Sequence, residues 1–96
     1  MEKQRTTAPG LRLRLYVAGG APNSVRAIAN ARAICDEHFP ASHELEIVDL
    51  LEHPNRAQAD GIVVTPTLLK LSPLPVQRVV GSLSDTAQLL VALSSV

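Results

Sequence analysis

The residues that could carry catalysis are few and lie far apart along the chain. Thiol–disulfide exchange needs a cysteine at a helix N-terminus, where the dipole lowers its pKa, and a second cysteine to resolve the mixed disulfide. At the start of the first expected helix the chain has Gly20-Ala21-Pro22-Asn23-Ser24, and the one cysteine, Cys35, lies three turns further on. We therefore predict no dithiol redox activity and interpret Cys35 as a small buried apolar residue.

The remaining polar residues do not form a recognisable site either. The chain has three histidines, at His38, His43 and His53. Their positions lack the i, i+3 or i, i+4 spacing of metal ligands on a helix. Asp49 and Asp60 are not spaced as a general acid and base, and Ser24, without a His/Asp arrangement near it, is predicted to form a hydrogen bond at a helix start. The sequence thus predicts no enzyme, no metal site and no cofactor.

Composition and charge exclude several classes of partner. The chain has 96 residues, with nine Lys plus Arg against nine Asp plus Glu. Binding to nucleic acid or to an anionic membrane depends on an excess of positive charge, which this neutral chain lacks. With only two aromatic side chains, stacking on nucleic-acid bases is not expected either. No apolar run approaches the roughly 20 residues that span a bilayer, and the single cysteine fits a reducing compartment. We expect a soluble cytoplasmic protein that binds neither nucleic acid nor membranes.

The hydropathy pattern predicts one domain over residues 11–96, behind a polar segment, residues 1–10, that we expect to be a flexible tail. Residues 11–17 alternate apolar and polar side chains, which is typical of a strand with one apolar face. Residues 22–39 predict an alanine-rich amphipathic helix, with Pro22 and Asn23 as first-turn and capping residues. Its apolar stripe is predicted to consist of Val25, Ile28, Ala31, Ile34 and Cys35.

The middle of the chain predicts shorter elements. Residues 45–50 predict a strand that is apolar on both faces, as a central parallel strand is. Pro54 and Gly61 bracket one or two helical turns. Residues 62–71 predict a strand that Pro66 interrupts at its start, and a proline-rich turn joins it to another strand over residues 76–80.

The last element is predicted to be a helix that Ser84 caps, with Asp85 in its first turn. Its apolar side chains are expected at Leu83, Ala87, Leu90, Val91 and Leu93. The predicted order is therefore βαβαββα in a single α/β domain, which is the pattern of a thioredoxin-like fold. In that fold the proline at the position of Pro66 is usually cis and lies beside the active site.

Five blocks of sequence together resemble one family. The blocks are Leu15-Tyr16-Val17-Ala18-Gly19, Pro22-Asn23-Ser24-Val25-Arg26-Ala27, Val48-Asp49-Leu50, Thr65-Pro66-Thr67-Leu68 and Pro73-Leu74-Pro75-Val76. From Leu11 to about Leu93 the chain resembles the KaiB family of circadian clock proteins. The resemblance implies a non-enzymatic regulator that binds a KaiC-like hexameric ATPase and autokinase and modulates its cycle, in circadian or hourglass timing or in a stress response. It also implies KaiA or a KaiC-responsive sensor kinase as further partners.

The same resemblance implies two folds for one sequence. The ground state would be a homo-oligomer, a dimer or a tetramer, with the order βαββααβ, and the partner-binding state would be a thioredoxin-like monomer. Such switching requires two packings that differ by only a few kcal/mol. Pro66, Gly81 and Ala92 are carried over as fold-setting positions. Ala92 stands where cyanobacterial members have glycine, and because glycine costs a helix about 1 kcal/mol relative to alanine, we expect this chain to populate the thioredoxin-like state more.

Three basic residues, Arg26, Lys70 and Arg78, occupy positions that support partner association in the family. A solvated basic face is the other interpretation of these residues. Gly61 stands where cyanobacterial members have a partner-facing lysine, so that contact is lost. A function from another class also stays open: a thioredoxin-fold domain that binds glutathione or a thiol peptide, with Ser24 near the sulfur and no dithiol redox activity.

Overall fold

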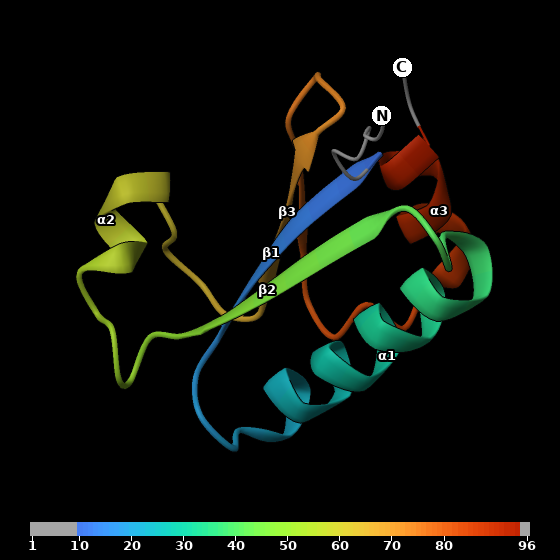
Figure 1. Ribbon diagram of the computed structural model, residues 1–96. Coiled ribbons are helices and arrows are strands. Elements are labelled where there is room, and N and C mark those ends of the chain that lie inside the picture. The colour runs from blue at the N-terminus through green and yellow to red at the C-terminus, as the bar shows by residue number, and fades with distance from the viewer. Residues whose placement is uncertain (1–9, 95–96) are drawn as a thin grey trace.

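The computed structural model describes residues 10–94, so the predicted tail, apart from Gly10, lies outside the described residues. The elements in this range are β1 (Leu11–Val17), α1 (Pro22–His38), β2 (His43–Asp49), α2 (Arg56–Asp60), β3 (Thr67–Ser72), β4 (Gln77–Val80) and α3 (Thr86–Ser94). Their order, βαβαββα, is the predicted one (Figure 1). It is the order of the thioredoxin-like state and not βαββααβ.

The four strands form one mixed sheet in the order β2-β1-β3-β4. β1 runs parallel to β2, in a register from Leu11↔His43 to Val17↔Asp49, and antiparallel to β3, which is in turn antiparallel to β4. The prediction of a central strand over residues 45–50 is wrong, because β2 lies at the edge of the sheet. The apolar side chains of β2 point alternately to the two faces of the sheet. Within β2 only Val48 is fully buried.

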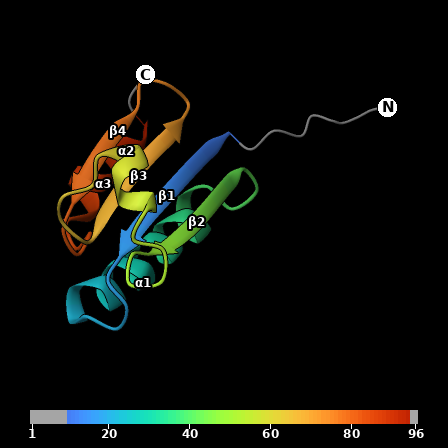
Figure 2. The same ribbon diagram turned by 90° about the vertical axis from the view of Figure 1, so that its left-hand side faces the viewer.

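Helices cover both faces of the sheet. α1 and α3 lie on one face and α2 lies on the other (Figures 1 and 2). The alternation in β1 directs its leucines toward α1 and α3. The predicted apolar face therefore forms, but Tyr16 on the other face is buried as well. The core on that side consists of Leu11, Leu13, Leu15, Val17, Ala27, Ala31, Ile34, Cys35, Leu68, Leu83, Leu89 and Leu93. A smaller cluster on the α2 side contains Tyr16, Val48, Ile62 and Leu69.

The first helix matches its predicted range to within one residue, but its stripe and its cap differ. Pro22 is in the first turn, and the buried side is made of Ser24, Ala27, Ala31, Ile34 and Cys35. Val25 is half exposed, because it lies about 100° around the helix from Ser24, which takes the inward position. Asn23 does not cap the helix; its Oδ1 accepts a hydrogen bond from Arg26.

Asp85, and not Ser84, caps α3. The backbone N–H of Gln88 donates to Asp85 Oδ1 over 3.0 Å, whereas the Ser84 hydroxyl is hydrogen-bonded to that of Ser82. The buried residues of α3 are Leu89 and Leu93, so the prediction that Ala87 and Val91 belong to the apolar side is wrong. The helix runs through Ala92 to Ser94, as expected for an alanine at that position.

The predicted fold-setting residues Pro66 and Gly81 lie against each other. The Thr65-Pro66 peptide bond is cis, as expected for this fold, and so are the bonds that precede Pro73 and Pro75. The Gly81 N–H donates to the Pro66 carbonyl over 2.9 Å, at a φ of +114° that side chains disfavour. Their role in choosing between two folds stays a prediction.

Candidate docking surface

Four large apolar side chains are exposed at one end of the sheet. Leu51 follows β2, Val63 and Val64 precede β3, and Val80 ends β4; they are 72%, 91%, 48% and 57% exposed. The strand directions bring these positions to the same end, since β1 and β2 finish there, β3 begins there and β4 finishes there. We call Leu51, Val63, Val64 and Val80 the docking surface.

Two loops at this end lie against each other. A Cβ atom on Gly19, in the loop after β1, would stand 2.7 Å from Leu51 Cδ1, so a side chain at this position would displace Leu51. Asp49 Oδ1 accepts hydrogen bonds from the backbone N–H groups of both Gly19 and Leu51. The Asp49 carboxylate thus binds the backbone of both loops and fixes the position of Leu51.

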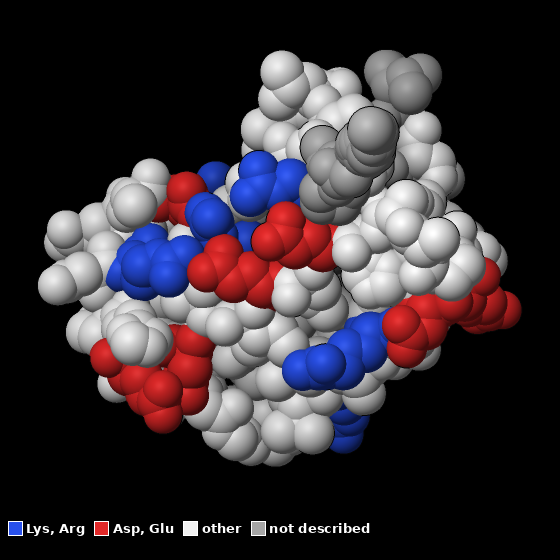
Figure 3. Space-filling model, in the orientation of Figure 1, with Lys and Arg blue, Asp and Glu red and all other residues white. Residues whose placement is uncertain are grey.

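A set of polar side chains attaches α2 to the sheet above β1 and β2. We call Arg14, Tyr16, Glu46, Arg56 and Asp60 the polar cluster. Arg14 Nε lies 2.7 Å from Glu46 Oε1 and its Nη1 lies 3.0 Å from Asp60 Oδ2, while Arg56 Nη2 lies 3.1 Å from Glu46 Oε2. The Tyr16 hydroxyl donates to Asp60 Oδ2. Basic and acidic side chains accordingly lie side by side on this part of the surface (Figure 3).

The polar cluster shifts the titration of its members. The hydrogen bond from Arg14 holds the pKa of Glu46 below its ordinary value, with Arg56 adding to the effect. The pKa of Asp60 is lowered first by the Tyr16 hydroxyl and then by Arg14. Burial raises the pKa of Tyr16, and the Asp60 carboxylate raises it further. At neutral pH both carboxylates are therefore ionised and Tyr16 is a hydrogen-bond donor.

Acid should weaken the polar cluster. Because the pKa values of Glu46 and Asp60 are lowered on folding, their contribution to stability is complete above the ordinary carboxyl pKa of about 4 and is lost as pH falls through it toward the lowered values. The groups that face them are Arg14, Tyr16 and Arg56. We expect urea unfolding to give a lower free energy at pH 3.5 than at pH 7, and a shallower pH dependence for Arg14→Gln. Identical pH dependence in both proteins would contradict the assignment.

The three basic residues predicted as partner contacts are not brought together. Arg26 is exposed on α1 and donates to Asn23, and Arg78 donates to the carbonyl oxygens of Asp60 and Gly61 at the end of α2, over 2.9 and 3.3 Å. Lys70 is only 1% exposed, on the face of β3 that is turned toward α1 and α3. In this fold the Lys70 side chain does not reach the surface, so a direct partner contact by it has no support here.

The thiol-ligand alternative loses its main residue. Ser24 is 1% exposed, and its hydroxyl oxygen accepts the backbone N–H of Ala18 over 3.0 Å. Ser24 therefore forms a hydrogen bond with the nearby backbone, as predicted for a residue at a helix start, and is not placed to contact the sulfur of a ligand. Cys35 is buried in the core, as predicted, and burial raises its pKa to about 11.

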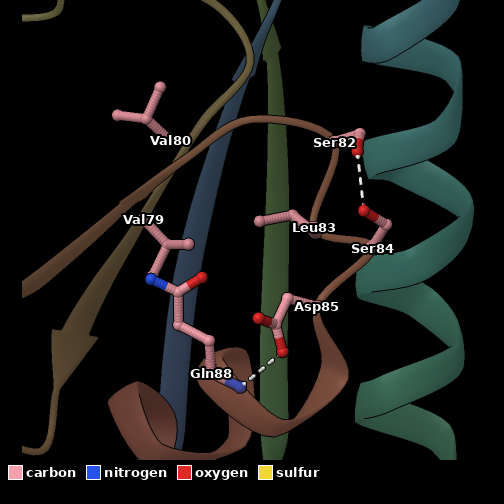
Figure 4. A pocket seen from close by; sticks show the side chains of 7 residues that line it. All are labelled: Val79, Val80, Ser82, Leu83, Ser84, Asp85 and Gln88. Carbon is pink, nitrogen blue, oxygen red and sulfur yellow. Dashed lines mark hydrogen bonds between the residues drawn. The ribbon is translucent and has the colours of Figure 1, made fainter.

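A cavity of about 250 Å³ lies where β4 leads into α3. It is lined by Val79, Val80, Ser82, Leu83, Ser84, Asp85 and Gln88 (Figure 4). The hydroxyl groups of Ser82 and Ser84 are hydrogen-bonded to each other, and the Asp85 carboxylate caps α3. These polar groups therefore stabilise the turn between β4 and α3. Residues 10–94 also contain no cluster of three or more His, Cys, Asp or Glu side chains placed to bind a metal ion, and no helix able to cross a membrane.

Sequence reasoning missed the docking surface. The apolar run Ile62-Val63-Val64 predicts the start of a strand, but β3 begins only at Thr67, because Pro66 has no N–H for the sheet and the chain turns there. Only Ile62 is buried; the two valines are left exposed. The sequence does contain a signal that the two valines lie in a loop: the run stands between Gly61, which ends a helix, and Pro66, which interrupts a strand.

Comparisons with known proteins agree with this fold and sequence pattern. Residues 14–95 match the KaiB domain. The circadian clock oscillator protein KaiB of Synechococcus elongatus is 46% identical over 81 residues, 84% of this chain and 79% of the relative. The circadian clock protein KaiB3 of Synechocystis is 45% identical over 84 residues, 88% and 82% of the two chains.

Solved structures show the same architecture. The N-terminal domain of Synechococcus elongatus SasA has a TM-score of 0.73 at 26% identity and covers 97% of this chain and 90% of its own. Mitochondrial thioredoxin 3 of Saccharomyces cerevisiae has a TM-score of 0.73 at 11% identity, covering 92% and 80%, which is a likeness of fold alone. With the domain matched over nearly the whole described range and relatives above 40% identity, this thioredoxin-like chain belongs to the KaiB family.

Proposed function

We propose that this chain is a non-enzymatic regulator that docks on a KaiC-like hexameric ATPase and modulates its ATPase or phosphorylation cycle. Membership of the KaiB family and the clock functions named for its relatives support the proposal. The observation that carries it is the docking surface, four large apolar side chains exposed at one end of the sheet. An apolar patch on the surface is typical of a site that another protein covers, and all four side chains lie at the same end of the sheet.

The docking surface has the form expected of a protein contact. Val80 belongs to β4, and the loops that carry Leu51, Val63 and Val64 are each joined to a β-strand at one end, so little order has to be gained on binding. Arg78 lies beside it at the end of α2, and Arg26 lies on α1; both are exposed. In this proposal the apolar residues supply most of the affinity and the two arginines act as rim charges that set orientation and association rate.

The direct test is size-exclusion chromatography with light scattering, on this chain alone and mixed with the KaiC-family ATPase of the same organism. The ATPase is loaded with ATP in one experiment and with ADP in another. A complex that forms in one nucleotide state and not in the other is the expected result. If no complex forms in either state, the proposed function is wrong while the fold stands.

We also propose that the chain interconverts with the oligomeric βαββααβ state expected from the family. A partner that binds only one of two folds has its apparent affinity reduced by the population of that fold, so the equilibrium itself regulates docking. The α-helical conformation of residues 86–94, with Ala92 in the last turn, is consistent with a preference for the thioredoxin-like state. Docking by KaiA or by a KaiC-responsive sensor kinase remains a prediction.

Replacing Ala92 by glycine should shift this equilibrium away from the thioredoxin-like state. Glycine in a helix costs about 1 kcal/mol relative to alanine, which corresponds to a change of about fivefold in the ratio of two states. Two-dimensional NMR of the wild type and Ala92→Gly measures the two populations. A single set of thioredoxin-like signals in both proteins, or residues 84–93 in a strand in the wild type, would contradict the proposal.

A further inference from the structure

The position of α2 has to be set by contacts outside the helix. α2 has five residues, Arg56–Asp60, and none of them is buried. A single helical turn of this length is unstable by itself in water. Its apolar contribution to the smaller core is one half-buried alanine, Ala57, together with Ile62, which follows the helix.

The side-chain contacts that hold α2 are polar, and most of them come from β1. Arg78 of β4 adds two hydrogen bonds to the backbone carbonyls of Asp60 and Gly61. Arg14 binds the Asp60 carboxylate at the end of the helix and, through Glu46, is connected to Arg56 at its start. Tyr16, fully buried, donates to the same Asp60 carboxylate. The side chains of Arg14 and Asp60 are 23% and 22% exposed, so this ion pair is shielded better than a surface pair.

The end of α2 is joined directly to the docking surface. Asp60 is followed by Gly61, which turns the chain with φ +66°, and by Ile62, whose N–H donates to Ala57 O over 2.8 Å. Val63 and Val64 come next. The position of the two exposed valines is therefore set by the contact of Asp60 with β1 and by Ile62 in the core, together with the hydrogen bonds from Arg78 of β4.

From this geometry we propose that Arg14, Tyr16 and Asp60 are positioning residues for the docking surface. They hold the end of α2 on β1, and by doing so they hold Val63 and Val64 in the arrangement that the partner ATPase meets. The inference rests on the proposed function, but its first half, the anchoring of α2, can be measured on the chain alone.

The chain contains a matched control. Arg12 and Glu44 form the same kind of ion pair across the same two strands, two residues before Arg14 and Glu46, with 3.0 Å between Nε and Oε1. This pair contains no residue of α2. Arg12→Gln therefore removes an arginine and an interstrand ion pair from β1 without touching the anchoring of the helix.

Hydrogen exchange measured by mass spectrometry tests the anchoring. In Arg14→Gln and Asp60→Asn, the amides of Ala57, Gly61 and Ile62 should exchange about tenfold faster relative to the amides of β1, since each variant removes a charged hydrogen bond. In Arg12→Gln the ratio should stay within about twofold of wild type. If the other variants do not fold, Tyr16→Phe, which removes one hydroxyl group, is used for the same exchange measurement. Equal protection of these amides in the cluster variants and in Arg12→Gln would overturn the proposal.

Binding separates the two hypotheses. Arg14→Gln and Asp60→Asn should lower the affinity for the KaiC-family ATPase by about tenfold or more, compared with Arg12→Gln, although neither changes an exposed apolar residue. Faster exchange in α2 with unchanged affinity would overturn the positioning role. If the wild type binds no such ATPase, the proposed function fails, and the exchange comparison alone then decides whether the cluster anchors α2.

Discussion

Replacing Leu51 and Val63 together by glutamate should lower the affinity for the KaiC-family ATPase by about 30-fold or more, because the loss of even one central apolar anchor at an interface costs about 2 kcal/mol. Both side chains are largely exposed in the free chain, at 72% and 91%. Surface substitutions of this kind change the free energy of unfolding by no more than about 0.5 kcal/mol. Titration calorimetry and urea unfolding on the same preparations measure both quantities.

The matched control for this prediction is Val91→Glu. Val91 is 71% exposed, but it stands on α3, on the opposite face of the sheet from α2. Its replacement adds one glutamate at a similarly exposed apolar position and should leave the affinity within about twofold of wild type. Equal losses of affinity in the double variant and in Val91→Glu would show that the docking surface is not where the partner binds.

Leu15→Ala should destabilise the fold by about 2 to 5 kcal/mol, the range for removing a buried leucine from a packed core. Leu15 lies in the central strand, is 0% exposed, and contributes to the core that α1 and α3 cover. A domain of this size has roughly 5 to 15 kcal/mol of stability in total, so this loss is a large part of it. Equilibrium unfolding in urea measures the change directly.

Leu51→Ala provides the comparison for Leu15→Ala. It deletes the same atoms from a leucine that is 72% exposed and should change the free energy of unfolding by less than about 0.5 kcal/mol. A loss below about 1 kcal/mol for Leu15→Ala would contradict the assignment of β1 as the centre of the core. Because both variants replace leucine by alanine, the difference between their free energies of unfolding measures the effect of burial alone.

The sequence determined the elements whose signals are local. Alternation over residues 11–17 predicts β1 and its buried leucines, since side chains in a strand point to opposite faces in turn. Pro22 and Gly61 mark a helix start and a helix end because each has a backbone preference that needs no tertiary contact. The order of these elements was sufficient for the thioredoxin-like fold, and the sequence blocks were sufficient for the family.

Tertiary structure decided which side chains are available. Lys70 follows the alternation of Leu68 toward the α1 and α3 face and is buried, although its charge favoured the surface. Arg78 is exposed but serves the end of α2. A residue's charge gives only a prior for exposure, whereas its register in the sheet fixes the face on which it lies.

The docking surface and the polar cluster were also decided by tertiary structure alone. Val63 and Val64 have the composition of a strand, and only the start of β3 beyond Pro66 leaves them outside the sheet. Arg14 and Asp60 are 46 residues apart in sequence and meet because α2 folds back over β1. Contacts of this kind depend on how separate elements pack against each other. A local pattern of residues cannot predict that packing.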